Sequence, residues 1–298
     1  MEPIYRTLYE TGKLEVIKDE LIAKLESCEL CPRKCCLNRK KEKLGFCKTG
    51  RYARVSSVFL HHGEERELVG RGGSGTIFFS WCNLGCNYCQ NYTLSHFGEG
   101  ETVSPQELAR MMLALQASGA ENINFVTPTH VIAQIVEALP LAIRQGLHLP
   151  LVYNCGGYES VPTLALLEGI FDIYMPDLKY SDNETAQEFS SAPDYWDIVR
   201  AAAKEMYRQV GDLTIAENLA RRGVLVRHLV LPNRLAGSFK VLDFIRDEIS
   251  PHTYVNIMQQ YRPCYRGGEY PQLARTITDE EFYEVVRYAK KVGLYRGF

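Results

Sequence analysis

Two hydrophobic patterns alternate along the chain from residue 76 onward. Short apolar runs, largely β-branched or aromatic, predict buried strands, and longer stretches with apolar residues every three or four positions predict helices. The predicted strands cover residues 76–80, 123–126, 149–154, 171–175, 224–231 and 253–258. The predicted helices cover residues 104–119, 131–145, 160–168, 184–210, 238–249 and 278–292, with a further helical turn or two at 213–222. This alternation predicts an α/β fold with parallel strands joined by helical crossovers.

Six strand–helix units are too few for a closed eight-stranded barrel, so we expect a partial (β/α)6, TIM-like barrel. Polar residues gather just after the predicted strands, for example at Thr127, Asp177 and Gln260. In barrel-like α/β sheets that edge carries the active site. We therefore expect the functional residues at the carboxyl ends of the strands.

The first 73 residues follow another pattern, and we expect a helical, cysteine-rich extension before a barrel domain at residues 74–298. An apolar stripe over residues 4–27 predicts one helix. Residues 50–80 predict a β-rich lead-in to the first barrel strand. The histidines and glutamates at 61–65 predict a turn whose polar side chains face solvent or the cysteine-bearing arm.

Composition narrows the class of protein. The chain has 298 residues, 46% hydrophobic and 23% charged, which is close to the globular average and argues against disorder. A net charge of −2 gives the protein no overall positive electrostatic potential that would attract nucleic acid or an anionic membrane. No apolar stretch approaches the roughly 20 residues of a spanning helix. The start of the chain does not resemble a signal peptide, so ten cysteines predict metal-binding thiols in a reducing, oxygen-poor cytoplasm.

Cys82, Cys86 and Cys89 form a C-x3-C-x2-C motif, with the aromatic Tyr88 before the third cysteine. Three thiolates can hold three irons of a [4Fe–4S] cluster and leave the fourth iron open. An open iron can bind the amine and carboxylate groups of S-adenosylmethionine (SAM). A structural zinc site would need a fourth ligand, and a disulfide framework would suit a short secreted chain.

A second cysteine group lies in the extension. Cys28, Cys31, Cys35 and Cys47 could supply four thiolates, with Cys36 spare or replacing Cys35. A closed four-thiolate site fits zinc or a second iron–sulfur cluster on spacing alone. The basic run at residues 39–43 predicts a solvated surface.

The cysteine motif and the six-strand layout together resemble the radical SAM superfamily. Within it, the chain most resembles the pyruvate formate-lyase activating enzyme group, especially uncharacterised members with an N-terminal cysteine segment. The predicted order of strands and helices resembles that of the family over roughly residues 74–290. The segments that carry it are 81–83 with Cys86, 88–91 (Tyr-Cys-Gln-Asn), 175–179 (Met-Pro-Asp-Leu-Lys), 227–232 (Arg-His-Leu-Val-Leu-Pro), 28–35 (Cys-x2-Cys-Pro-Arg-x-Cys) and 73–79 (Gly-Ser-Gly-Thr-Ile-Phe-Phe).

The resemblance implies roles for the motif residues. The three motif cysteines would ligate the cluster, and Tyr88 would lie against adenine. In the family, a Gly-Gly-Glu motif contacts the SAM amino group. This chain departs from the family there and has Thr127-Pro128-Thr129. The two threonine hydroxyls could accept hydrogen bonds from the SAM ammonium group. Gly156-Gly157 follows one strand later and predicts a turn.

Further SAM-binding candidates follow the later strands. Asn154 stands where the family has an acidic group, and Asp177 and Lys179 match an Asp-x-Lys pair near SAM. Arg227 matches a position near the SAM carboxylate, for which a guanidinium is suited, and Gln260 follows the last strand. A buried structural ion pair is the alternative for Asp177, Lys179 and Arg227.

The chemistry implied is reductive cleavage of SAM to a 5′-deoxyadenosyl radical that takes a hydrogen atom from a substrate. The leading hypothesis is a radical SAM enzyme that receives electrons from a reductant such as flavodoxin or ferredoxin, with a glycyl-radical protein as one candidate substrate. The missing Gly-Gly-Glu weakens the transfer of the activating role to this chain. The alternatives are radical modification of a small metabolite, a peptide or RNA. A non-catalytic iron–sulfur sensor or electron-transfer protein is the alternative of another class.

Overall fold

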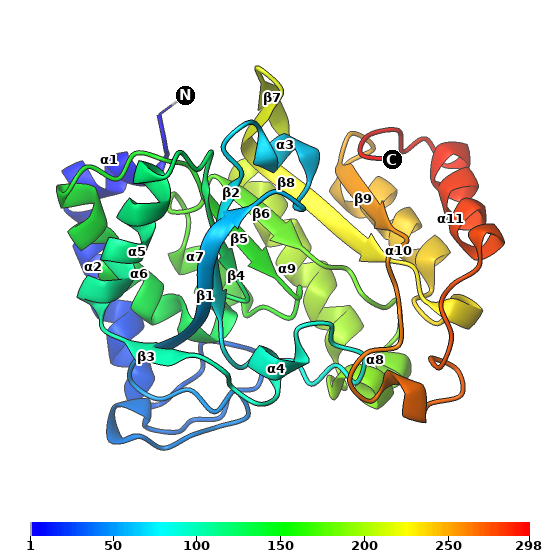
Figure 1. The fold of residues 1–298 in the computed structure, drawn as a ribbon, viewed down its shortest axis with the longest axis horizontal. Helices are drawn as coiled ribbons and strands as arrows, with labels where there is room; N and C mark the ends of the chain where they lie inside the picture. Colours follow the sequence, from blue (N-terminus) through cyan, green and yellow to red (C-terminus); the bar gives the residue numbers. More distant parts are fainter. Residues whose placement is uncertain (1) are drawn as a thin grey trace.

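The computed structural model describes residues 2–298, which form an α/β fold built on one sheet (Figure 1). The strands are β1 (Ala53–His61), β2 (Ser74–Phe79), β3 (Glu101–Val103), β4 (Ile123–Val126), β5 (Leu151–Cys155), β6 (Ile173–Pro176), β7 (Thr214–Ala216), β8 (Leu219–Leu229) and β9 (Tyr254–Met258). Within the described residues the sheet has nine strands in the order β3-β1-β2-β4-β5-β6-β8-β7, with β9 also paired to β8.

Six of these strands form the predicted parallel array. β2, β4, β5, β6, β8 and β9 pair in parallel in that order, which is also their order in the chain. β1 and β3 add an antiparallel edge beside β2. The sheet does not close on itself among the described residues, so the predicted partial barrel is confirmed.

Helices cover the sheet between the strands. They are α1 (Tyr5–Glu10), α2 (Lys13–Ala23), α3 (Arg66–Val69), α4 (Tyr92–Ser95), α5 (Pro105–Ala117), α6 (Ile132–Arg144), α7 (Val161–Leu166), α8 (Asn183–Ser190), α9 (Tyr195–Val210), α10 (Ser238–Phe244) and α11 (Asp279–Lys291). The predicted start of α5 is confirmed by a capping box, in which Ser104 and Glu107 satisfy each other's backbone N–H groups.

One predicted helical segment is wrong. Residues 213–222 form a β-hairpin in which β7 pairs antiparallel with β8. The two turn residues, Glu217 and Asn218, have φ values of 54° and 63°, as a two-residue turn of type I′ requires. Local sequence did not reveal that β8 continues back beyond Val224 to meet β7.

Two long predicted helices are each divided in the structure. The stripe over residues 4–27 breaks at Gly12, whose φ of 74° separates α1 from α2. The stretch 184–210 breaks after α8 at Ser191, which has a φ of 54°. In both cases a left-handed residue ends the first helix and redirects the chain.

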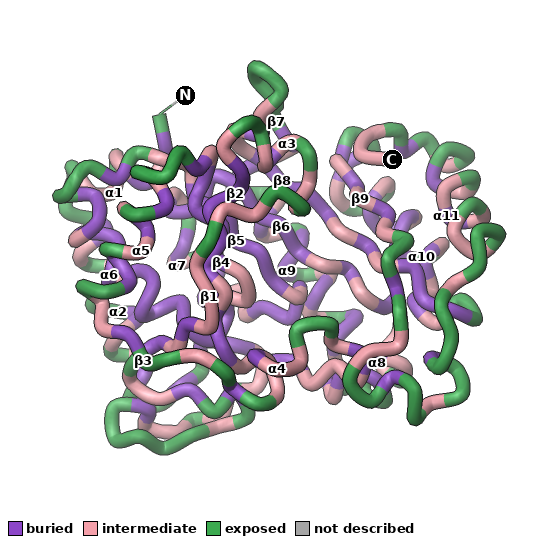
Figure 2. Tube along the Cα trace, viewed as in Figure 1, coloured by how far each residue is buried: buried purple, intermediate pink, exposed green. Residues whose placement is uncertain are grey.

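The N-terminal helices pack directly on the barrel. α2 contacts α6, and α6 is buried on nearly all sides because neighbouring helices cover it. The Tyr5 hydroxyl donates to the Leu149 carbonyl at 3.0 Å, and the Ile4 N–H donates to Asp172 at 3.0 Å. Figure 2 shows the central strands buried along most of their length. The division into residues 1–73 and 74–298 stays a prediction.

His228 ties β8 to the segment after β6 and to α10. It is fully buried, with Nδ1 2.6 Å from the Leu178 carbonyl oxygen and Nε2 2.8 Å from the Ser238 hydroxyl. Burial lowers the pKa of His228 to about 4, so the imidazole stays neutral where an exposed histidine would be charged.

Replacing His228 by Gln should flatten the dependence of stability on pH. As pH falls from 6.5 to about 4, the unfolded chain protonates this histidine while the folded chain does not, so the wild type loses free energy of unfolding. The loss should reach about 3 kcal/mol, and H228Q should not show it. Urea denaturation across this pH range measures the difference. The exposed His148→Gln should keep the wild-type slope, and equal slopes for all three proteins would contradict the prediction.

Candidate active site

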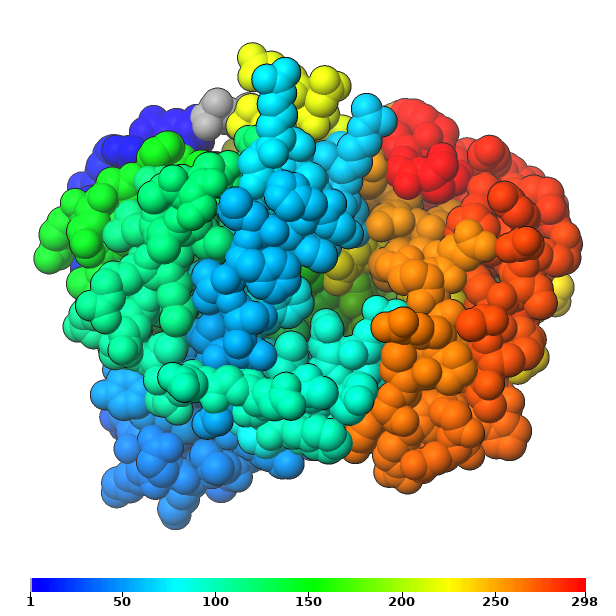
Figure 3. Space-filling view, in the orientation of Figure 1, coloured from blue at the N-terminus to red at the C-terminus, as the bar shows by residue number. Residues whose placement is uncertain are grey.

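The three motif cysteines lie on the loop after β2, at the edge where the parallel strands end. Cys82, Cys86 and Cys89 line a cavity of about 250 Å³. The strand ends contribute Val126, Thr127, Asn154, Cys155, Asp177, Lys179, Arg227, Leu229, Met258 and Gln260 to the same lining. In Figure 3 the surface is hollowed between the cyan segment around β1 and β2 and the orange segment after β9. The structure therefore brings most of the predicted site residues together.

The thiol groups of the loop interact with one another. Burial raises the pKa of the Cys82 and Cys89 thiols, and the nearby Cys86 sulfur raises both further. Each sulfur accepts one hydrogen bond. The Leu84 N–H donates to Cys82 at 3.3 Å. The Ser190 hydroxyl donates to Cys86 at 3.0 Å, and the Ser95 hydroxyl donates to Cys89 at 3.2 Å. Buried, hydrogen-bonded thiolates beside a cavity suit an iron–sulfur cluster, because the irons supply the positive charge that ionised thiolates need.

Two backbone outliers flank the cavity. Trp81, just before Cys82, has a φ of 69°, and Thr127, after β4, has a φ of 63°. A left-handed conformation is costly for a β-branched residue such as threonine, and such strain clusters at functional sites. A Cβ atom at Gly98 would collide with the Trp81 ring, so glycine is needed there.

A network of buried charges crosses the ends of β5, β6 and β8. The Asp177 carboxylate accepts from Lys179 Nζ at 2.6 Å and from Arg227 Nε at 2.8 Å. Arg227 also donates to the Asn154 side-chain oxygen at 2.7 Å. Burial alone would raise the pKa of Asp177, but Arg227 and Lys179 outweigh burial and lower it. Asp177 is therefore a carboxylate that fixes two cations at the cavity wall.

Glu64 also belongs to this network, a position that its sequence context did not predict. The predicted solvent-facing turn is wrong for this residue, since its carboxylate lies 3.3 Å from Arg227 and accepts from Asn124 at 2.9 Å. Burial raises the pKa of Glu64 to about 7. Arg227 therefore has a second carboxylate partner in Glu64, whereas its other neighbour, Asn154, is uncharged. In the sequence, the only sign of a role for Glu64 is its position in a run of charged residues.

The two predicted threonines separate. Thr127 lines the cavity, whereas the Thr129 side chain donates to Glu159 at 2.6 Å and lies outside the cavity lining. Glu159 also accepts from the Tyr153 hydroxyl at 2.8 Å, and burial raises its pKa to about 7. The structure thus leaves Thr127 as the hydroxyl of this pair that faces the cavity.

Aromatic packing fixes Tyr88, which stands between Cys86 and Cys89 in the motif. Its ring makes edge contacts with Tyr180 and Tyr261, at centroid distances of 6.4 and 5.7 Å. Gln260 is held through its backbone carbonyl, which accepts from the Gln90 side chain at 3.2 Å. Both Tyr88 and Gln260 line the cavity, as the predicted SAM contacts should.

The four N-terminal cysteines named in the sequence also come together. Cys28, Cys31, Cys35 and Cys47 line a second, smaller cavity in the extension. Cys36 is exposed, with its sulfur 3.3 Å from a Glu29 carboxylate oxygen, and it is not part of the cavity lining.

The basic run beside these cysteines is only partly a solvated surface. Lys40 and Lys41 are exposed, but Arg39 is 2% exposed and donates to the His130 carbonyl at 2.8 Å. The prediction of a solvated face is therefore wrong for Arg39. Its long side chain reaches the backbone just before α6, which begins at Ile132.

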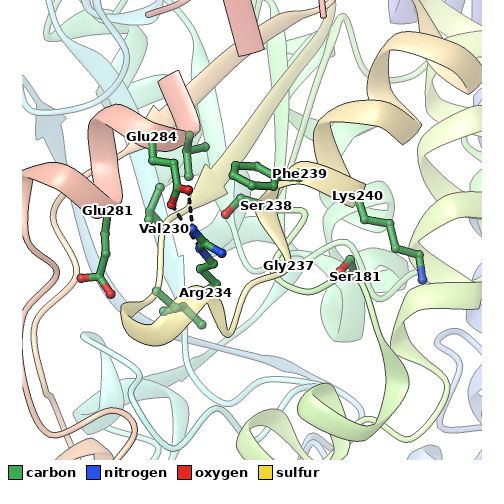
Figure 4. A pocket seen from close by; sticks show the side chains of 11 residues that line it. Ser181, Val230, Arg234, Gly237, Ser238, Phe239, Lys240, Glu281 and Glu284 are labelled. Carbon is green, nitrogen blue, oxygen red and sulfur yellow. Dashed lines mark hydrogen bonds and ion pairs between the residues drawn. The ribbon is translucent and has the colours of Figure 1, made fainter. Parts of the chain in front are cut away.

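A third cavity, of about 250 Å³, lies away from the cysteine loop. It is bounded by the segment after β8 and by helices α10 and α11, and Arg234 and Glu284 form an ion pair at its side (Figure 4). Its lining shares no residue with the lining of the cysteine cavity. None of the predicted site residues lies there.

Comparisons with known proteins agree with this arrangement. A family model described as the radical SAM superfamily matches residues 76–233. The uncharacterised protein MJ0674 of Methanocaldococcus jannaschii is 33% identical over 96% of this chain and 83% of its own length. A second uncharacterised protein of that organism, MJ0808, is 22% identical over 85% of this chain and 78% of its own length.

A solved structure shares the fold. HydG, described as a maturase of the [FeFe]-hydrogenase, aligns with 74% of this chain at 15% identity and a TM-score of 0.52. The chain spans half the length of that protein. Within residues 2–298 the structure contains no helix with both the length and the apolar character that crossing a membrane requires.

Replacing Asp177 by Asn should destabilise the protein strongly. The change would leave Lys179 and Arg227, whose side chains are 18% and 16% exposed, without their shared counter-ion. We expect a loss of about 3–5 kcal/mol in the free energy of unfolding, measured by denaturation. Glu168→Gln is the matched control, because it removes a carboxylate from an exposed ion pair with Arg208 and should change little. Equal stability of the two variants would contradict the prediction.

Proposed function

Because the chain belongs to the radical SAM superfamily, we propose that it takes a hydrogen atom from a substrate that reaches the cavity at the ends of its parallel strands. The cofactors of this family are a [4Fe–4S] cluster and SAM, which together supply a 5′-deoxyadenosyl radical. The observation that carries the proposal is that the three cysteines of the loop line the same cavity as the polar ends of five other strands.

The residue roles that we propose follow from these contacts. Cys82, Cys86 and Cys89 hold the cluster. Arg227 uses three of its five N–H groups on Asp177, Asn154 and Glu64, which leaves two N–H groups for the SAM carboxylate. The partners of Arg227 hold its planar guanidinium in one orientation, so they act as positioning residues.

Other cavity residues would complete SAM binding. The Thr127 hydroxyl can accept a hydrogen bond from the SAM ammonium, in place of the Gly-Gly-Glu motif of the activating enzymes. Tyr88 offers an aromatic surface to adenine, and Gln260 closes the far side of the cavity. Leu84, Val126 and Leu229 provide apolar walls that keep water away from a reactive radical.

The open side of the cavity supports a protein substrate. Sites for small-molecule ligands have volumes of about 300–1,000 Å³. The cavity of about 250 Å³ would hold the cluster and SAM first, so a substrate would approach from its open side. A protein segment entering from the hollowed surface needs less enclosed volume, since most of it stays outside (Figure 3).

We therefore propose a glycyl-radical protein as the substrate, with hydrogen taken from a backbone glycine. The segments at residues 175–179 and 227–232, which resemble motifs of the pyruvate formate-lyase activating enzyme group, support this class. Members of the superfamily need an electron donor, and we propose a flavodoxin or ferredoxin for this role. The ten free cysteines of the described chain support a reducing, oxygen-poor cytoplasm as its setting.

The first test is SAM cleavage. Anaerobically reconstituted wild type, reduced with dithionite, should form 5′-deoxyadenosine, measured by chromatography. A triple variant with Cys82, Cys86 and Cys89 each changed to Ala should form none, because the cluster has lost its ligands. Cys36→Ala is the matched control and should retain the wild-type rate. A wild type that holds its cluster and never cleaves SAM would favour a non-catalytic iron–sulfur protein.

The second test concerns the substrate. The reduced enzyme and SAM are mixed with a glycyl-radical protein from the same organism, and electron paramagnetic resonance is recorded. We expect a glycyl-radical signal that grows with 5′-deoxyadenosine. A substrate variant with the reactive glycine changed to alanine should give neither. If only a small metabolite, a peptide or an RNA stimulates 5′-deoxyadenosine formation, the activating role is refuted while radical SAM catalysis stands.

A further inference from the structure

The cysteine cavity of the extension is a built site. Cys28, Cys31 and Cys47 are each less than 10% exposed, and Cys35 completes the lining. The loop that carries them is held by backbone hydrogen bonds, such as the Cys28 N–H to the Leu37 carbonyl at 3.0 Å. The four cysteines therefore line one cavity on a loop held by hydrogen bonds.

The cysteines of this site line a small empty space. Zn–S bonds of about 2.3 Å would draw four sulfurs into van der Waals contact, leaving no space between them. The cavity here has a volume of about 10 Å³, close to the space of one water-sized sphere. Within residues 2–298 no three Cys, His, Asp or Glu side chains are arranged to hold a single metal ion. Cys82, Cys86 and Cys89 are likewise not arranged around a single metal ion, although their motif predicts a [4Fe–4S] cluster.

Arg39 brings an unpaired buried charge to the cavity. It is 2% exposed, has no carboxylate partner among the described residues, and its Nη1 lies 3.7 Å from the Cys28 sulfur. Its Nη2 has no hydrogen-bond partner within residues 2–298. A buried cation with a free N–H group calls for an anionic acceptor, and thiolates and inorganic sulfides are such acceptors.

His130 adds an unpartnered nitrogen to the same lining. It is 1% exposed, and its Nε2 lies 2.8 Å from the Ser80 carbonyl oxygen, so Nε2 carries the proton. Its Nδ1 is buried and has no partner within the described residues. The free Nδ1 is a buried hydrogen-bond acceptor, so this end of the cavity has a polar group that is not satisfied by the protein.

We propose that Cys28, Cys31, Cys35 and Cys47 ligate a second iron–sulfur cluster of the [4Fe–4S] type. Arg39 donates an N–H to its sulfur atoms and balances part of its negative charge. The site is fixed to the first cluster loop by Arg33, which lines this cavity and donates to the Asn83 carbonyl at 2.9 Å. This inference does not depend on the substrate proposed above.

The test removes the first cluster and leaves the N-terminal site unaltered. The full chain with Cys82, Cys86 and Cys89 changed to Ala is purified and reconstituted without oxygen. Iron, sulfide and zinc are then measured per chain, and electron paramagnetic resonance is recorded after dithionite reduction. We expect about four irons and four sulfides per chain with a cluster signal, against about eight irons in the wild type.

Two further changes in that background test the ligand set. Cys31→Ser should abolish the cluster signal, whereas Cys36→Ala should retain both the iron and the signal. Circular dichroism checks that each chain is folded. One zinc without iron in the triple variant, or no bound metal at all, would overturn the proposal. Retention of the signal in C31S, or its loss in C36A, would overturn the assigned ligands.

Discussion

Parallel pairing of six strands is the constraint on which this structure depends. Because β2, β4, β5, β6, β8 and β9 run in one direction, each of them ends at the same edge of the sheet. Residues far apart in the chain, such as Cys82, Asp177 and Gln260, therefore meet around one cavity. The cysteine loop brings three thiols to this cavity, and the sheet determines which other side chains surround them.

The buried charges at that edge depend on one another. Asp177 joins Lys179 and Arg227, and Glu64 reaches Arg227 from the segment after β1. The uncharged Asn154 is acceptable beside Arg227 because Glu64 brings a carboxylate from elsewhere in the fold. The charge balance of the site is thus a property of the tertiary structure, and a motif comparison along the sequence does not display it.

The N-terminal extension is built into the barrel. α2 packs against α6, β1 pairs with β2, and Arg33 and Arg39 donate to backbone carbonyls of Asn83 and His130. These contacts place a second group of cysteines next to the first cysteine loop. A radical SAM barrel with a metal centre held against its cluster loop would have two one-electron centres in one rigid unit.

The sequence by itself determined the class of fold and predicted which loop would hold a cluster. Strand–helix alternation predicted six parallel strands, and the spacing of Cys82, Cys86 and Cys89 predicted the cluster loop, because both depend on local pattern. Only the tertiary structure decided what long-range contacts control: the β7–β8 hairpin, the burial of Glu64 and Arg39, and the position of Thr129 on Glu159. Hydrophobic periodicity shows which face of an element is buried, but it does not show which distant polar group will meet it there.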